Sequence, residues 1–212
     1  FSQVTNPPID SLRENEVMSL KTRFGNLGNI LDFENLTKDN IYVLDSPILS
    51  NNQFKKFSSF FKSNLKVLDC TFNIKHHLKE RLDQLRAEAE IAVREGCKHL
   101  ILSDKKISEK KVAIPMMLAF GAINSSLINL GIRGFVSINV QSSEVLDTHS
   151  VAVLLGVGAT TINPYLAFDS IYQRYEKKLF GKLNYEECIQ QYIKSINNGL
   201  LKIMSKMGIS VL

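Results

Sequence analysis

The sequence predicts an α/β protein built on a mostly parallel sheet of alternating βα units, either Rossmann-like or like a truncated (β/α) barrel. Two observations support this prediction. From residue 41 onward, short apolar runs recur that have the length and the aliphatic or β-branched content of strands. Helical patterns lie between them, and such alternation indicates βαβ units. We therefore expect at least four parallel strands, joined by right-handed crossovers.

Each predicted strand is a compact apolar run closed by polar or turn-forming residues. The first run, IYVLD, ends just before Ser46 and Pro47, which favour a turn. The runs that follow include LKVLD and HLILS, in which aliphatic side chains dominate. The predicted strands are residues 41–45, 65–69, 99–103, 134–140 and 159–163.

The first 40 residues come before this alternation of strands and helices, and they are predicted to be irregular apart from one short helix. Pro7 and Pro8 favour an extended path. Asp10 is a good N-cap for a helix that would begin directly after it.

The later helices are predicted from apolar spacing and end signals. Residues 77–96 alternate apolar and charged faces and end at Gly96. Residues 113–130 are apolar on most sides, which predicts a helix buried on two faces. Asp147 is the predicted cap of a helix that stops at Gly156. Two polar-faced helices, at 167–180 and 184–205, are expected to close the chain.

Composition narrows the class of protein. The chain has 212 residues, of which 44% are hydrophobic and 22% are charged, as in ordinary globular domains. The longest wholly apolar stretch, 151–159, is too short to cross a membrane. The net charge is +5, but the basic residues are scattered beside acidic ones, and no nucleic-acid-binding motif occurs. We expect neither nucleic acid nor a membrane as a partner.

Polar residues follow the predicted strands at the edge where parallel sheets bind ligands. Two interpretations remain open. The residues could form a small-molecule site, or they could be caps and turns, which Ser, Asp and Asn favour in any case. They are Asp45, Ser46, Asp69, Thr71, Ser103, Asp104, Lys105, Gln141, Ser142, Ser143, Glu144 and Asn163.

Other candidate motifs have simpler structural interpretations. The segment 156–159 (GVGA) follows a helix rather than a strand, so it predicts a helix stop and not a phosphate loop. His76 and His77 are predicted to start a surface helix, because adjacent residues cannot easily reach one metal ion. His149 is expected to be packed and hydrogen-bonded. The three cysteines are widely spaced and are expected to be reduced and buried: Cys70, Cys97 and Cys188.

Several segments, spread over the whole chain, resemble the central domain of glutamate synthase large subunits. The longest are the opening FSQVTNPPID with LRE at 12–14, and GLLKIMSKMGIS at 199–210. Shorter ones are VMSL at 17–20, SPIL at 46–49, LSD at 102–104, IP at 114–115, LA at 118–119, GA at 121–122, LLG at 154–156, GA at 158–159 and INPYLAF at 162–168. Because the chain starts at Phe1 and shows no signal segment, we expect it to be a piece of a longer protein.

The resemblance implies a role within an enzyme that converts glutamine and 2-oxoglutarate into two glutamates. It implies an interdomain segment with a short helix at residues 1–40, and an α/β central domain at 41–212. That domain would connect an amidotransferase domain with a domain that holds FMN and a [3Fe-4S] cluster. Electrons would come from ferredoxin or from an NADPH-dependent small subunit. The compartment would be the cytoplasm or the plastid stroma.

The resemblance also implies which residues matter. It assigns no catalytic, cofactor-binding or metal-binding residue to this chain. It places Thr5, Asn6 and Ile9 beside an internal channel that carries ammonia between the two active sites. Two other functions remain open, namely a self-contained βα enzyme or phosphate-ligand domain that uses the polar strand ends, and a docking module for a redox partner.

Overall fold

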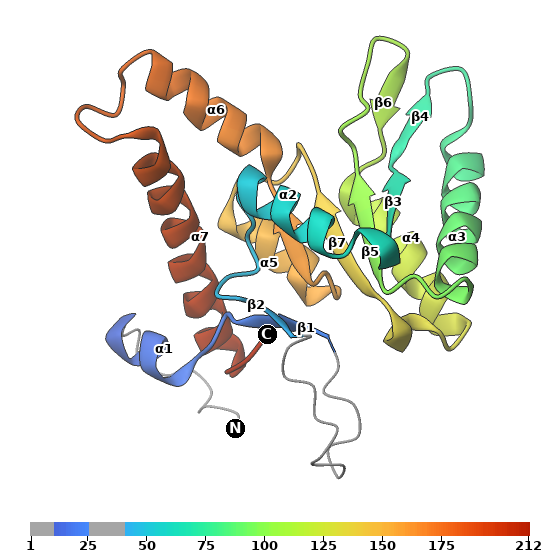
Figure 1. The fold of residues 1–212 in the computed structure, drawn as a ribbon, viewed down its shortest axis with the longest axis horizontal. Helices are drawn as coiled ribbons and strands as arrows, with labels where there is room; N and C mark the ends of the chain where they lie inside the picture. The colour runs from blue at the N-terminus through green and yellow to red at the C-terminus, as the bar shows by residue number, and fades with distance from the viewer. Residues whose placement is uncertain (1–10, 26–40) are drawn as a thin grey trace. The chain divides into compact units, whose positions relative to one another are not determined.

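The computed structural model describes residues 11–25 and 41–212 (Figure 1). It divides into two compact units. One comprises Phe1–Pro47 with Asn197–Leu212, and the other comprises Ile48–Ile196. The predicted division between residues 40 and 41 stays a prediction.

A four-stranded parallel sheet lies in the Ile48–Ile196 unit, as the sequence predicts. Its strands pair in the order β3-β5-β7-β8, which is also their order along the chain. A sheet wound in one direction is the arrangement of (β/α) barrels, whereas a Rossmann sheet reverses its strand order at a switch point. The truncated barrel is therefore the better of the two predicted descriptions. The strands are β3 (Leu65–Asp69), β5 (His99–Ser103), β7 (Ser137–Gln141) and β8 (Thr161–Asn163).

The predicted helices are present, with ends shifted by a few residues. α3 and α4 pack against each other and contact β3 and β5 respectively. Asp147 caps α5 as predicted, because its carboxylate accepts a hydrogen bond from Ser150 N at 2.8 Å. The helices are α1 (Ser11–Val17), α3 (Leu78–Arg94), α4 (Met116–Asn129), α5 (Thr148–Gly156), α6 (Tyr165–Glu176) and α7 (Tyr185–Met207). The predicted cap Asp10 lies outside the described residues.

The prediction for residues 41–45 is wrong in its pairing. This segment forms β2 (Tyr42–Leu44), which pairs antiparallel with β1 (Thr22–Phe24) in the other unit. The parallel contact predicted for it comes a few residues later, where Ile48 bridges Ile162 of β8. Burial explains why Ile48, and not β2, lies beside β8. Val43 of β2 is 50% exposed, which suits a two-stranded ribbon, whereas Ile48 is 1% exposed.

Several elements were not predicted from the sequence. α2 (Asn51–Phe60) begins with a capping box, in which Ser50 and Gln53 exchange side-chain hydrogen bonds with each other's backbone. Two short 3₁₀ helices are η2 (Lys62–Asn64) and η3 (Arg133–Phe135). An antiparallel pair is formed by β4 (Thr71–Asn73) and β6 (Lys111–Ala113), which extend beyond the ends of β3 and β5.

The two faces of the parallel sheet differ in chemistry. Alternation and register put six apolar side chains on one face, each at most 1% exposed. These are Leu68, Leu100, Leu102, Ile138, Val140 and Ile162. The opposite face, called the polar face below, carries His99, Ser103, Ser137, Asn139, Gln141, Thr161 and Asn163. α2 covers part of the polar face, because the Phe57 and Phe61 rings lie 5.9 and 4.1 Å from the ring of His99.

The turn after α5 confirms the predicted helix stop and gives a first testable prediction. Gly158 has φ +109°, a conformation that favours glycine, and Ala159 N donates to Leu154 O to close the helix end.

Gly158→Ala should lower the free energy of unfolding by about 1 kcal/mol, measured by urea denaturation. Gly156→Ala is the matched control, because Gly156 has no positive φ and open space where a Cβ would lie. Equal stability of the two variants would contradict this account.

Candidate functional site

The predicted strand-end residues of the sheet do gather, and they bond mainly to one another. Ser103 Oγ donates to Gln141 Oε1 at 2.8 Å, and Gln141 Nε2 donates to Asn163 Oδ1 at 3.1 Å. Asn163 Nδ2 then donates to Leu49 O at 2.9 Å and to Asn51 Oδ1 at 3.0 Å. This row crosses three strands and ends at the beginning of α2.

A second row lies deeper on the polar face and was not predicted. His99 Nδ1 lies 2.8 Å from Ser137 Oγ, and Asn139 Nδ2 donates to the same oxygen at 3.1 Å. Thr161 Oγ1 donates to Asn139 Oδ1 at 2.7 Å. The sequence does contain a pattern that predicts this row, because the polar residues of β7 recur with period two and so share one face of the strand. The pattern was not recognised, because apolar residues alternate with the polar ones.

Asp104 is a buried carboxylate surrounded by hydroxyl and backbone donors. Its side chain is fully buried and accepts hydrogen bonds from Ser142 Oγ at 2.9 Å, from Ser143 N at 2.8 Å and from Ser143 Oγ at 3.0 Å. Nearby, burial and then the negative charge of Asp104 raise the pKa of Tyr165 to about 12. Lys105 Nζ lies 5.7 Å from the centroid of that ring.

These contacts favour the caps-and-turns interpretation of the strand ends. The amides, hydroxyls and carboxylate that could have held a ligand are instead paired within the fold. The side-chain donors of Ser103, Gln141 and Asn163 are all engaged within the row.

Two predicted site residues belong to the other compact unit. Asp45 Oδ1 lies 3.8 Å from Lys21 Nζ, and Ser46 Oγ donates to Asn197 Oδ1 at 2.8 Å. They follow β2, which is not a strand of the parallel sheet. The predicted channel residues Thr5, Asn6 and Ile9 lie outside the described residues.

The histidine and cysteine predictions are partly confirmed. His76 and His77 are exposed at the start of α3, as expected. Cys70 and Cys188 are buried, and burial raises the pKa of Cys70 to about 12, but Cys97 is only half-buried. No three His, Cys, Asp or Glu side chains gather as metal ligands within residues 11–25 and 41–212.

The prediction that His149 is packed is wrong. Its side chain is exposed at the rim of a pocket of about 230 Å³ between the starts of α4 and α5. It lies on the first turn of α5, and the buried residues of this helix are Val151 and Leu154 instead. In the same pocket Glu144 Oε2 accepts a hydrogen bond from Met116 N at 2.9 Å and so caps α4.

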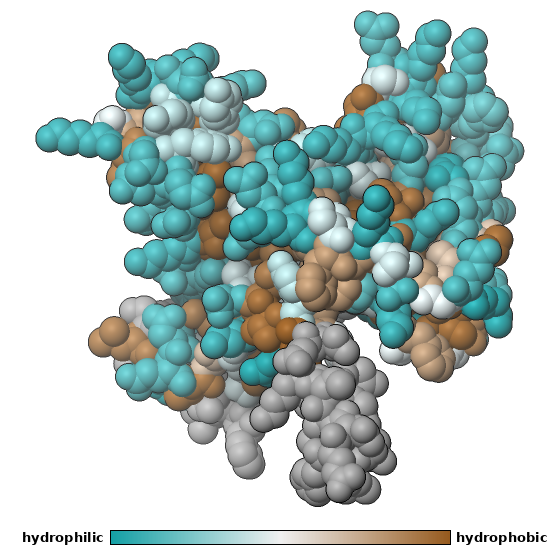
Figure 2. Space-filling model, viewed as in Figure 1, coloured by the Kyte–Doolittle hydropathy of each residue, from teal (hydrophilic) through white to brown (hydrophobic). Residues whose placement is uncertain are grey.

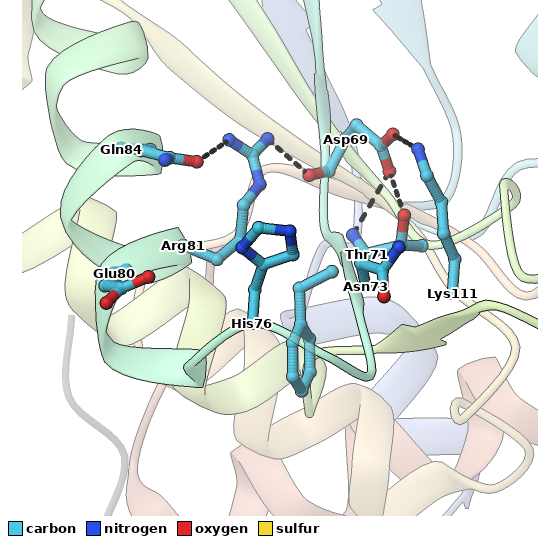
Figure 3. A pocket seen from close by; sticks show the side chains of 9 residues that line it. Asp69, Thr71, Asn73, His76, Glu80, Arg81, Gln84 and Lys111 are labelled. Atoms are coloured by element: carbon cyan, nitrogen blue, oxygen red, sulfur yellow. Dashed lines mark hydrogen bonds and ion pairs between the residues drawn. The ribbon is translucent and has the colours of Figure 1, made fainter.

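A larger polar pocket of about 350 Å³ opens at the end of β3 (Figure 3). Its walls come from α3 and from the β4–β6 pair, and the predicted residues Asp69 and Thr71 lie in it. Of the other lining residues, only His76 was considered from the sequence, as the start of a surface helix, and the rest were not predicted because α3, β4 and β6 come from separate parts of the sequence. These other lining residues are Phe72, Asn73, His76, Glu80, Arg81, Gln84 and Lys111.

Two charged side chains of this pocket, called the β3-end pocket below, are held by contacts within the fold: Asp69 and Arg81. Arg81 Nη2 donates to Asp69 O at 2.8 Å, and the same guanidinium pairs with Glu88. Burial alone would raise the pKa of Asp69. Hydrogen bonds from Thr71 and the charges of Lys106 and Lys111 outweigh it, so the pKa lies below its ordinary value. Asp69 therefore remains ionised around neutral pH.

None of the described helices is long and apolar enough to span a membrane.

A structural comparison gives a match to a flavocytochrome b2 mutant with benzoylformate. That match has a TM-score of 0.48 and 14% sequence identity, and it covers 84% of this chain and 38% of the other.

Sequence comparisons give much stronger matches. The chain is 49% identical over 215 residues to the large chain of the NADPH glutamate synthase of Azospirillum brasilense. It is 40% identical over 227 residues to the chloroplastic ferredoxin-dependent glutamate synthase of Oryza sativa subsp. japonica. Each match covers 100% of this chain but only 14% of the relative.

A family model for the glutamate synthase central domain matches residues 1–212, which is the whole chain. The resemblance found in the sequence motifs is thereby confirmed. The chain belongs to the glutamate synthase central domain family.

Proposed function

We propose that this chain acts as the connecting domain of a glutamate synthase large chain. The observation that carries the proposal is the match of the entire chain, end to end, to the central part of such large chains. The proposed overall reaction transfers the amide nitrogen of glutamine to 2-oxoglutarate. Hydrolysis of the amide leaves one glutamate, the released ammonia condenses with 2-oxoglutarate to an imine with loss of water, and reduction of that imine by two electrons and two protons gives the second glutamate.

In this proposal the chain supplies no catalytic residue. The amidotransferase domain and the domain that holds FMN and the [3Fe-4S] cluster are other parts of the same large chain. The strand-end contacts support this division, because their groups are already paired. Ferredoxin or an NADPH-dependent small subunit supplies electrons, in the cytoplasm or the plastid stroma.

The proposed contribution of the chain is to help form the ammonia channel. Pro7 and Pro8 stiffen the segment that carries Thr5, Asn6 and Ile9, so a narrow passage there would keep its width. Thr5 and Asn6 can hydrogen-bond a small polar guest. Ile9 helps to exclude bulk water, which would protonate and dilute the ammonia.

Blocking that passage should uncouple the two halves of the enzyme. In the full-length enzyme, Thr5→Trp is expected to leave glutamine hydrolysis active while glutamate formation from glutamine falls several-fold. Both rates are measured in one assay, as glutamine consumed and glutamate formed. Thr5→Ser is the matched control, because it keeps the hydroxyl and the small volume. One-to-one coupling at the wild-type rate in Thr5→Trp would contradict the channel role.

A further inference from the structure

The fold gathers the excess positive charge of the chain on one surface. Residues 73–79 (NIKHHLK) and 105–112 (KKISEKKV) together carry six lysines and one glutamate. The whole chain has 26 basic and 21 acidic residues, so the remaining residues carry equal numbers of positive and negative charges. These two segments, called the basic surface below, therefore hold the entire net charge of +5.

Backbone hydrogen bonds hold the two segments side by side. Asn73 pairs with Lys111 in the β4–β6 ladder, and Ile74 N donates to Lys110 O at 3.2 Å. A tight turn then joins Ser108 to Lys111, whose N–H groups each donate to the other's carbonyl oxygen, at 3.0 and 3.1 Å. The lysines are thus carried on a folded support. Figure 2 shows mainly hydrophilic side chains projecting at the upper right, where Figure 1 places β4 and β6.

Most of these positive charges are not offset within the chain. Lys106 and Lys111 lie 3.7 and 3.6 Å from the same oxygen of Asp69, so that carboxylate offsets one of them. With Asp69 and the adjacent Glu80 both counted, the basic surface still has a net charge of +3. Three of its lysines form no ion pair with any of the residues 11–25 and 41–212: Lys75, Lys79 and Lys110.

Branched apolar side chains lie exposed among the lysines. Ile74 is 59% exposed, Ile107 is 47% exposed and Val112 is 39% exposed. By alternation and register, Ile74 and Val112 share one face of the β4–β6 pair. Lysines alone would be enough to keep a sheet edge soluble and unpaired. Cations beside exposed isoleucines are instead typical of a surface that contacts another protein surface.

We propose that the basic surface docks against an acidic surface of another domain of the same large chain. Its lysines pair with Asp and Glu side chains of that domain. Its exposed isoleucines and Val112 pack against apolar groups that lie between those acids. The inference rests on the proposed function in one respect, namely that the chain acts within a large chain, and it does not involve the ammonia channel.

Two observations favour a domain of the same chain over a separate protein. The chain covers only 14% of the large chains that it resembles, so most of such a chain lies outside it. The basic surface comprises 15 residues, whereas a stable interface between separate proteins uses about 20–30 residues on each side. Tethering within one chain raises the effective concentration of the partner to about the millimolar range, so a smaller contact is enough.

A nucleic acid fits the basic surface less well than an acidic protein surface does. The two segments contain no arginine, which binds phosphates in a bidentate manner, and no phenylalanine, tyrosine or tryptophan on which bases could stack. Exposed isoleucines have no role in contacts with a phosphate backbone. The apolar groups therefore decide between the two classes of partner.

Zero-length cross-linking of the full-length large chain tests the proposal. A carbodiimide joins a lysine amine to a carboxylate only where the two groups touch, and mass spectrometry of the product that runs as one polypeptide identifies the joined residues. The lysines of the basic surface should link to Asp or Glu outside residues 1–212 several-fold more often than Lys55 and Lys56, which are exposed on α2. These links should fall several-fold between about 0.01 M and about 1 M salt, because salt screens contacts between exposed charges.

Charge reversal supplies matched variants. Lys75→Glu/Lys110→Glu should reduce the linking of Lys79 and Lys106 several-fold, because it places negative charges against an acidic partner. The control Lys55→Glu/Lys56→Glu makes the same change in charge and should leave the linking as in the wild type. All four substituted lysines are exposed, and far-UV circular dichroism checks that both variants are folded.

Three outcomes would overturn the proposal. In the first, the lysines of the basic surface link to other domains no more often than Lys55 and Lys56 do. In the second, their links lead mainly to a separate polypeptide or a nucleic acid. In the third, linking is unchanged in Lys75→Glu/Lys110→Glu. Glutamate formation from glutamine is measured on the same wild-type preparation, so normal formation without such links would refute the docking contact alone and leave the proposed function standing.

Discussion

Replacing Asp104 by alanine should lower the free energy of unfolding by about 3 kcal/mol. The carboxylate is fully buried and accepts hydrogen bonds from Ser142 Oγ, Ser143 N and Ser143 Oγ. Hydrogen bonds to a charged group are worth more than neutral ones, and their loss leaves buried donors without an acceptor. Urea denaturation of the 212-residue chain at neutral pH measures the effect.

Three further variants decide what the buried carboxylate does. Ser143→Ala removes only one hydroxyl donor and should cost about 1 kcal/mol. Asp83→Ala breaks an exposed ion pair with Arg86 and should change stability by less than about 0.5 kcal/mol. Asp104→Asn should destabilise, because it turns an acceptor into a donor that faces other donors. If Asp104→Asn were instead more stable than the wild type, the charge would be a net cost, and the structural role of the carboxylate would be refuted.

Much of the parallel sheet could be predicted from the sequence, because its strands are strongly apolar and its helices have clear end signals. The pairing partners of some strands could not be predicted. Residues 41–45 have the pattern of a strand of the sheet, yet β2 pairs with β1. Local pattern fixes whether a segment is extended, but not which partner buries it. β4 and β6 were missed for the same reason, since neither is apolar enough to be recognised without the other.

The candidate site, like the sheet, could be predicted only in part. Winding in one direction brings strand ends together, so the row from Ser103 through Gln141 to Asn163 could be anticipated. The sequence could not tell whether these groups face a ligand or one another. That depends on the placement of α2 and Leu49, which engage the last amide of the row. One wall of the β3-end pocket is formed by the β4–β6 pair, which was not predicted.

The polar face also makes the domain sensitive to acid through His99. His99 is 6% exposed, and its ring packs against Phe57 and Phe61. Burial first, and then the positive charge of Lys98, lower the pKa of His99 from 6.5 to about 4. Between pH 6.5 and pH 4 the unfolded chain therefore binds a proton at His99 that the folded chain does not. Stability from this group is complete above pH 6.5 and is lost as the pH falls through that window.

The expected loss is about 1.4 kcal/mol per pH unit below pH 6.5, and about 3 kcal/mol by pH 4. Other groups titrate in the same window, so the free energy of unfolding is measured by urea denaturation for the wild type and for His99→Gln at each pH. Glutamine keeps a polar partner for Ser137 Oγ but does not titrate. The difference between the two proteins isolates His99. It should shrink steadily from pH 6.5 to pH 4 and stay constant above pH 7. Parallel curves across the whole range would mean that His99 is protonated as easily in the fold as in the unfolded chain, and that its contacts on the polar face do not exclude the charge.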